Sequence, residues 1–257
     1  MLSIRVIPTL LLKDEGLVKG SMFKDHKYVG DPINAVKIFN EKEVDEIIFL
    51  DISATNKKSE LNYELIKDIA SEAFMPFSYG GGITSIYQIE RLFNIGVEKV
   101  ILNTSAFFNP SLITEASKVA GSQSIVVSID VRKSIWGKQE VYVNNGSLCT
   151  NRNPIDYAKQ MQDLGAGEIM ICSINQEGTR KGYDLELVRN VSDAVSIPVI
   201  ASGGAGSLND LFEAIKKANA SAVAVGDMFV FQGKHKAVLI TYPKYSELQL
   251  LFNEIKQ

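Results

Sequence analysis

The sequence predicts an α/β fold, a single (β/α)8 TIM barrel with an internal twofold repeat, because one long pattern occurs twice. A stretch beginning DPINAVK at Asp31 recurs as NPIDYAK at Asn153, and each copy reads as alternating helices and apolar runs. Each copy is therefore a set of β-α units. The matched positions all differ by 122 residues: Pro32 and Pro154, Lys37 and Lys159, Glu46 and Glu168, Pro76 and Pro198, Gly81 and Gly203, and Ser85 and Ser207.

The length of the chain is the second observation behind this prediction. At 257 residues, the chain matches a closed barrel, which typically takes about 250 residues. Four β-α units alone would leave an open half-barrel with exposed sheet edges, whereas eight units close the sheet. We therefore expect one domain over residues 1–257, with halves at about 1–122 and 123–245.

Eight strands follow from short aliphatic or β-branched runs that end at turn residues. They are expected at 4–11, 47–51, 75–79, 100–103, 125–130, 168–173, 198–202 and 222–226. Helical periodicity is expected at 32–41, 63–73, 86–94, 110–119, 154–164, 185–194, 208–217 and 246–255. Asp31, Asn109 and Asn153 each precede a proline, which predicts three helix starts with a capping side chain.

Connections differ at the two ends of the predicted strands. The segments 12–30 and 131–152, which leave strands, are long and polar, and we interpret them as loops, whereas the segments that enter strands are short. In barrels of this class the active site lies where strands end. The asymmetry therefore predicts a functional site at the carboxyl ends of the strands.

Two glycine pairs predict phosphate sites at this end. Each pair follows a strand and precedes a helix, where backbone N–H groups can approach an anion closely. A single pair is more often an ordinary tight turn, but a symmetric repeat favours two phosphate sites and a long ligand with a phosphate at each end. The expected phosphate-binding residues are Gly81, Gly82, Asn103, Thr104, Gly203, Gly204, Gly226 and, from the first long loop, Lys19.

Asp130 is the candidate general acid or base, because it ends a strand, SIVVSID, at the predicted mouth of the barrel. Asp51, Asn175 and Glu177 are expected beside it. A solvated loop carboxylate is the alternative interpretation of Asp130. The position equivalent to Asp130 in the first half is Leu11, so the chain has one central carboxylate where its symmetry allows two.

Four charged residues alternate in sign at the starts of the strands: Arg5, Glu46, Lys99 and Glu168. Their ordinary interpretation is a solvated rim at the bottom of the barrel. Alternatively, a ring of two cations and two anions directed at the barrel axis would close or gate a pore.

Composition excludes several classes of protein. The net charge of −3 argues against a nucleic-acid groove, which needs a basic face, and no apolar run approaches the roughly 20 residues of a membrane span. Cys149 and Cys172 lack metal-ligand spacing, as do His26 and His235, so we expect no metal and no cofactor. Two isolated thiols suit a reducing compartment, and we expect the cytoplasm.

The assembled motifs resemble the cyclase subunit of imidazole glycerol phosphate synthase, from residue 1 to about 232. The resemblance implies a (β/α)8 barrel that docks by its N-terminal face on a glutaminase subunit, which releases ammonia into the barrel. It also implies that the four-charge ring gates this passage, which replaces the solvated-rim interpretation. The matching stretches include VKG at 18–20, FLDI at 49–52, GGGI at 80–83, GAGEI at 165–169, EGTRKGYDLEL at 177–187 and IPVIASGG at 197–204.

The upper end departs from the pattern of the family. Family members carry an aspartate at the end of strand one that acts with the strand-five aspartate in ring closure, and here Leu11 replaces the first while Asp130 keeps the second. Glu177 stands within the motif that is RDGT in the family. Asp227 replaces a serine, and a carboxylate is unfavourable beside a phosphate. One acid-base group contributes roughly 10²–10⁴-fold to a rate, and Leu11 cannot transfer a proton. Because the lower ring is intact while half of the upper chemistry is missing, ammonia delivery is better supported than cyclisation.

Three hypotheses follow. The first is a paralogous branch of the family in which the barrel conducts ammonia to a separate sugar amidotransferase of surface-polysaccharide (O-antigen) biosynthesis, with a phosphorylated ligand retained in the barrel. The second is a true cyclase of histidine biosynthesis that relies on Asp130 and Glu177. The third is a catalytically dead scaffold that activates the glutaminase.

Overall fold

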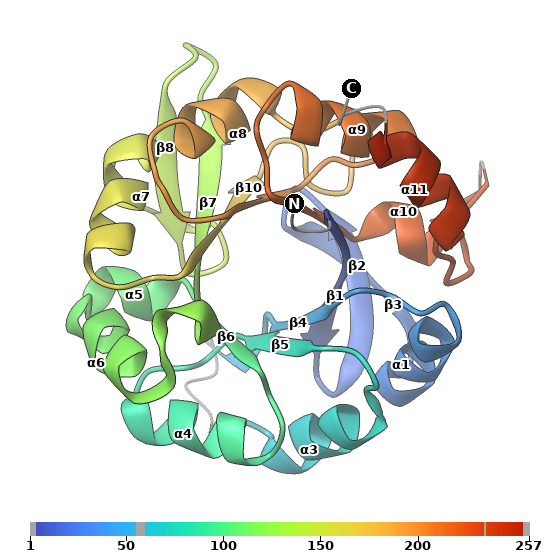
Figure 1. Cartoon of the computed structure of the whole chain (residues 1–257), viewed down its shortest axis with the longest axis horizontal. Helices are drawn as coiled ribbons and strands as arrows, with labels where there is room; N and C mark the ends of the chain where they lie inside the picture. The colour runs from blue at the N-terminus through green and yellow to red at the C-terminus, as the bar shows by residue number, and fades with distance from the viewer. Residues whose placement is uncertain (1–3, 55–59, 234, 254–257) are drawn as a thin grey trace.

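The computed structural model describes residues 4–54, 60–233 and 235–253, and these form a closed parallel barrel inside a ring of helices (Figure 1). Each barrel strand pairs with the next, β7 pairs with β10, and β12 returns to β1. The predicted (β/α)8 barrel is thereby confirmed. Its eight strands are β1 (Arg5–Lys13), β4 (Ile47–Asp51), β5 (Phe77–Gly80), β6 (Lys99–Leu102), β7 (Ile125–Lys133), β10 (Glu168–Ser173), β11 (Val199–Ser202) and β12 (Ala222–Val225).

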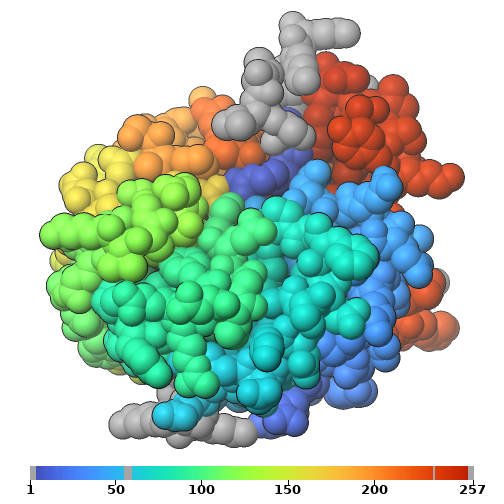
Figure 2. Space-filling view, turned by 60° about the horizontal axis from the view of Figure 1, so that its bottom comes forward, coloured from blue at the N-terminus to red at the C-terminus, as the bar shows by residue number. Residues whose placement is uncertain are grey.

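Helices cover the outside of the barrel, and in Figure 2 α3 and α4 fill its wall between α1 and α6. The end of the helix expected at 246–255 lies outside the described residues. The described helices are α1 (Pro32–Glu41), α3 (Tyr63–Glu72), α4 (Ile86–Asn94), α5 (Thr104–Phe108), α6 (Ser111–Ala120), α7 (Pro154–Asp163), α8 (Leu185–Ser192), α9 (Leu208–Lys216), α10 (Asp227–Val230) and α11 (Tyr245–Asn253), with one 3-10 turn, η1 (Ser122–Ser124).

Helix starts repeat between the two halves. Asp31 caps α1 and Asn153 caps α7, each followed by proline in the first turn, as predicted. Ser85 and Ser207 form capping boxes at α4 and α9. The prediction that Asn109 caps a helix is wrong, because Asn109 ends the unpredicted helix α5 and Pro110 occupies the cap position of α6.

The two segments interpreted as loops instead form antiparallel hairpins. β1 and β7 continue beyond the barrel wall, and each extension pairs with a returning strand, β2 (Gly16–Ser21) or β8 (Gln139–Val143). Strand β3 (Lys24–Gly30) pairs with β2, and β9 (Leu148–Cys149) with β8. Asp14 and Glu15, at positive φ, make the turn that reverses the first chain segment. The hairpins therefore obey the same twofold relation as the barrel.

The barrel interior is a packed apolar layer, since inward and outward side chains alternate along each strand. The outward residues pack against the helices. The inward layer separates the charged lower end from the upper end, and loss of hydration within it costs a charged species far more than a small neutral molecule. It consists of Ile7, Ile48, Ile101, Val126, Met170, Ile200, Ala222 and Ala224.

Short C-terminal elements complete the barrel. β13 (Phe231–Gln232) and β14 (Ala237–Val238) form a small hairpin after α10. The Tyr242 hydroxyl donates a hydrogen bond of 3.0 Å to the carbonyl of Val6 and thereby ties the chain end to β1. The division into halves at 1–122 and 123–245 stays a prediction.

Candidate functional site

A cavity of about 1010 Å³ opens at the carboxyl ends of the barrel strands. Every residue expected to act in catalysis or phosphate binding lines it, although their roles are not thereby shown. Asn175 does not belong to it, because its side chain hydrogen-bonds the backbone of Lys133 on the rim. The lining includes Leu11, Lys19, Gly81, Gly82, Asn103, Thr104, Asp130, Glu177, Gly203, Gly204 and Gly226.

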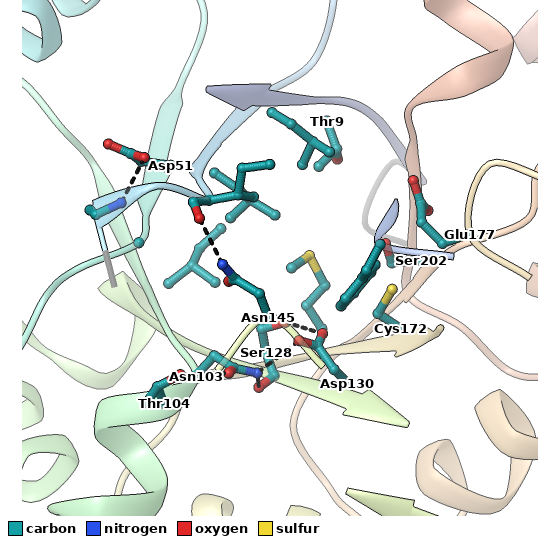
Figure 3. Close-up of a pocket in the computed structure, with 18 of the residues that line it drawn as sticks. Thr9, Asp51, Asn103, Thr104, Ser128, Asp130, Asn145, Cys172, Glu177 and Ser202 are labelled. Carbon is teal, nitrogen blue, oxygen red and sulfur yellow. Dashed lines mark hydrogen bonds between the residues drawn. The ribbon is translucent and has the colours of Figure 1, made fainter. Parts of the chain in front are cut away.

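Asp130 lies on one wall of the cavity, with Thr9 on the opposite side (Figure 3). Its carboxylate accepts hydrogen bonds from Ser128 Oγ at 3.3 Å and Asn103 Nδ2 at 3.2 Å. Burial raises the pKa of Asp130 to about 7; the Ser128 and Asn103 hydrogen bonds oppose the shift and the charge of Glu177 adds to it. A carboxyl group with this pKa can both take up and release a proton near neutral pH.

This pKa shift predicts a pH-dependent stability. The folded pKa lies above the unfolded value of about 3.9, so folding favours the protonated carboxyl and the free energy of unfolding falls as pH rises from about 4 to about 7. Asp130→Asn removes this loss. Because Asp130 lines a cavity that opens to solvent, part of its charge is screened. We therefore expect the variant to be more stable than wild type by on the order of 2 kcal/mol at pH 8 and equally stable near pH 4.

Urea unfolding of both proteins at the two pH values measures this difference. An Asp130→Asn effect that is the same at pH 4 and pH 8 would contradict the assigned titration.

Leu11 takes the place of a second carboxylate. Along β1, Arg5, Ile7, Thr9 and Leu11 share the inward face, and Leu11 and Thr9 line the cavity. Leu11 pairs with Val18 of β2 and Leu50 of β4 in the sheet, as expected for a strand residue at the mouth. Its side chain cannot carry a proton, so position 11 gives Asp130 no acid-base partner.

Glu177 and Lys19 form an ion pair at the edge of the cavity. Lys19 lies on β2 and its side chain is only 4% exposed, so it is held inside the protein rather than extended into solvent. The backbone carbonyl of Glu177 also accepts a hydrogen bond of 2.9 Å from Met22 N–H, which joins the loop after β10 to the first hairpin. Glu177 is therefore positioned by the β2–β3 hairpin.

The two glycine pairs lie at equivalent positions after β5 and β11. Gly81 and Gly203 adopt φ values of 108° and 85°, which side chains rarely tolerate. We call Gly81, Gly82, Asn103 and Thr104 the first corner, and Gly203, Gly204, Gly226 and Asp227 the second corner. Both corners line the same cavity.

The second corner contains an ion cluster that sequence reasoning missed. Arg180 donates through Nε to the Asp227 carboxylate, and its Nη2 donates to the backbone carbonyls of Asp227 at 2.7 Å and Phe231 at 2.6 Å. Lys236 Nζ lies 3.4 Å from the other Asp227 oxygen. The unfavourable carboxylate expected from the sequence is therefore neutralised, by cations 47 and 9 residues away in the chain.

The two hairpins meet above the cavity. Phe23, in the turn between β2 and β3, lies so close to Gly146, in the turn between β8 and β9, that a Cβ on Gly146 would approach its ring to 3.0 Å. Asn145 Nδ2 donates a hydrogen bond of 2.7 Å across the cavity to the carbonyl of Ile52. His26 also lines the cavity, and burial together with Lys13 and Lys19 lowers its pKa. These contacts could not be predicted from the sequence, because the segments that make them were interpreted as loops and not as hairpins.

The four charged residues at the strand starts form one closed ring at the lower end. Arg5 pairs with Glu46 at 2.6 Å and with Glu168, and Lys99 pairs with Glu46 at 3.1 Å and with Glu168 at 2.9 Å. The hydroxyl of Ser78 donates a hydrogen bond of 2.9 Å to Glu46. The two carboxylates are almost fully buried, so this ring closes the axis of the barrel and is not a solvated rim.

The ring predicts a large stability effect. Glu46→Gln leaves Arg5 and Lys99 sharing one carboxylate, and we expect the free energy of unfolding to fall by about 3 kcal/mol. The control is Glu186→Gln, because Glu186 pairs with Lys133 at the exposed surface, where an ion pair contributes less than about 1 kcal/mol. Urea unfolding of both variants measures the contrast, and equal effects would contradict the buried ring.

Two further findings concern metal sites and membrane spans among the described residues. Across residues 4–54, 60–233 and 235–253, no three His, Cys, Asp or Glu side chains are placed to hold a metal ion. In the same ranges no helix is both long and apolar enough to cross a membrane.

Comparison with known proteins identifies the family. A family described as "Histidine biosynthesis protein" matches residues 5–236. A provisionally named imidazole glycerol phosphate synthase subunit, hisF2 of Pseudomonas aeruginosa, is 52% identical over 97% of this chain and 100% of its own length. The similarly provisional hisF3 of Vibrio vulnificus is 48% identical, covering 96% and 95%.

A relative from Hydrogenobaculum, named imidazole glycerol phosphate synthase subunit HisF, is 42% identical over 97% of this chain and 99% of its own length. The matched range of the family contains the lower ring, the barrel core and the cavity. The chain therefore belongs to the histidine biosynthesis protein family and is similar along almost its whole length to HisF subunits of imidazole glycerol phosphate synthase.

Proposed function

We propose that this chain is the barrel subunit of a glutamine amidotransferase complex and that it conducts ammonia without closing the imidazole ring. A glutaminase subunit docks at the N-terminal face, and ammonia enters through the ring of Arg5, Glu46, Lys99 and Glu168. The observation that carries the proposal is the combination of this intact ring with Leu11 in the upper cavity.

The lower ring suits a gate for a small neutral molecule. Its four charges balance, so it has no net negative charge that would favour ammonium over neutral ammonia, and Arg5 and Lys99 are each partly exposed at the lower surface. Above it lies the apolar layer of Ile7, Val126 and Met170. Ammonia crosses such a layer far more readily than the ammonium ion, because a bare charge there would be expensive.

The upper cavity supports a different end use for the ammonia. Asp130 retains the properties of an acid or base, but Leu11 cannot act as its partner. We propose that the acceptor is a sugar bound to a separate amidotransferase of surface-polysaccharide (O-antigen) biosynthesis, in the cytoplasm. The cavity, with Gly81, Gly82, Asn103 and Thr104, keeps a site for a phosphorylated ligand.

A second candidate function is cyclisation in histidine biosynthesis. Two observations favour it: the pKa of Asp130 lies near 7, and Glu177 reaches the same cavity from the loop after β10, the strand that pairs with β7. The relatives named as imidazole glycerol phosphate synthase subunits agree with either function. The third, a scaffold that only activates the glutaminase, gains no support from a closed charge ring.

Complementation separates the first two functions. In a bacterial strain that lacks its cyclase subunit and requires histidine, expression of this chain with its glutaminase is expected not to restore growth. Expression of an ordinary cyclase subunit with its own glutaminase is the positive control. Growth without histidine, at comparable protein levels, would refute the proposed function and favour the cyclase.

A further inference from the structure

The two corners of the cavity differ in one chemical respect. In the first corner, the residue after Asn103 is Thr104, a neutral hydroxyl that accepts a hydrogen bond of 3.0 Å from Asn144 N–H. In the second corner, the residue after Gly226 is Asp227, whose carboxyl side chain is only 3% exposed. The internal symmetry therefore offers a comparison between a strand end followed by a hydroxyl, Thr104, and a strand end followed by a buried carboxylate, Asp227.

Cations surround Asp227 as they would surround a bound anion. Arg180 binds the carboxylate through Nε and the backbone through Nη2, and Lys236 lies 3.4 Å from the other carboxylate oxygen. The loop that carries Arg180 packs directly on the second corner, because a Cβ on Gly204 would lie 2.1 Å from the carbonyl oxygen of Gly182 in the same loop. The charge of Arg180 is thus directed at a group of the protein itself.

Lys19, a third cation beside the second corner, is also paired within the protein. A Cβ on Gly226 would lie 2.5 Å from Nζ of Lys19, so the glycine leaves room for the ammonium group. That ammonium group is paired with Glu177. A phosphate at this corner would therefore meet the carboxylates of Asp227 and Glu177 and would have to displace them from Arg180 and Lys19.

We propose that Asp227 is a built-in anion that occupies the second corner, so that the cavity accepts a ligand with one phosphate, held at the first corner. This inference rests on the phosphate site of the proposed function and narrows it. The ligand class is a monophosphate, such as a sugar phosphate, rather than the long bisphosphate that the two glycine pairs predict. Asp227 is a specificity-determining residue for this choice.

Backbone amide signals of the barrel test the proposal, with inorganic phosphate as the probe and chloride at equal ionic strength as the control. In wild type, phosphate is expected to shift the amide signals of Gly81, Gly82 and Thr104 but not those of Gly203 and Gly204. In Asp227→Asn, which keeps the size of the side chain, shifts are expected at both corners. Affinity at the second corner should rise about tenfold or more, because a like charge is removed.

The reciprocal variant is Thr104→Asp, which places a carboxylate at the equivalent position of the first corner. It is expected to abolish the shifts of Gly81 and Gly82, and it keeps the test decisive if Asp227→Asn does not fold. Phosphate binding at both corners of wild type would overturn this inference alone. Absence of shifts at the first corner of wild type would overturn it together with the phosphate site of the proposed function.

Failure of Asp227→Asn to gain binding would show that the carboxylate is not what excludes phosphate, and would also overturn the inference. Ammonia conduction is tested with variants of the lower ring, so the result of that test does not depend on phosphate binding at either corner.

Discussion

Lys99→Ala is expected to lower the rate of glutamine-dependent amidation about tenfold or more, while the rate with added ammonium salt stays unchanged. Without Lys99, Glu46 and Glu168 share Arg5 alone, and the ring carries one excess negative charge. One unbalanced charge at about 4 Å is worth on the order of 4 kcal/mol near a protein surface. The ring would then favour ammonium over ammonia, and ammonium cannot cross the apolar layer above it.

The measurement is the ratio of glutamine-dependent to ammonium-dependent rate in the complete amidating system. Lys37→Ala serves as the control, because Lys37 pairs with Glu72 on the exposed outer wall, where both side chains meet solvent. An unchanged ratio in Lys99→Ala, with the complex intact, would favour the scaffold hypothesis over ammonia conduction.

Leu11→Asp is expected to raise ammonium-dependent conversion of the ribulosyl formimino intermediate by roughly 10²-fold or more, since one acid-base group contributes about 10²–10⁴-fold. The new carboxylate would face the cavity from β1, across from Asp130 on β7. Two groups could then share the proton transfers that ring closure needs.

Leu11→Asn is the matched control, because asparagine is polar and has the size of aspartate but cannot transfer a proton. Adding Asp130→Asn to Leu11→Asp should remove the gain. A gain that Leu11→Asn reproduces would show that polarity at this position, not proton transfer, limits the reaction.

The barrel and the residues that line its cavity could largely be predicted, because both follow from alternation within each strand and from the internal repeat. Alternation along β1 places Arg5 at the lower end and Leu11 at the upper end of one inward face. The repeat offset aligns Glu46 with Glu168, and the structure brings both to Arg5 and Lys99. Strand ends meet at one face of any parallel barrel, so the cavity residues converge without a detailed model of the loops.

What could not be predicted depends on contacts between distant segments. The hairpins form because β1 and β7 extend past the barrel wall, and polar residues such as Lys19 and Glu140 concealed this pattern. Arg180 gave no sign that it would meet Asp227, 47 residues away, since nothing local relates the two. Asn109 matched a helix cap but serves the helix before it instead.

The most direct test of the account follows glutamate and cyclised product together in the wild-type complex, supplied with glutamine and the ribulosyl formimino intermediate. We predict that glutamate is released, and that the cyclised product forms at a rate at least about 10²-fold lower than the rate of glutamate release. One cyclised product for each glutamate would contradict the account, and would show that Asp130 and its neighbours suffice for ring closure without a carboxylate at position 11.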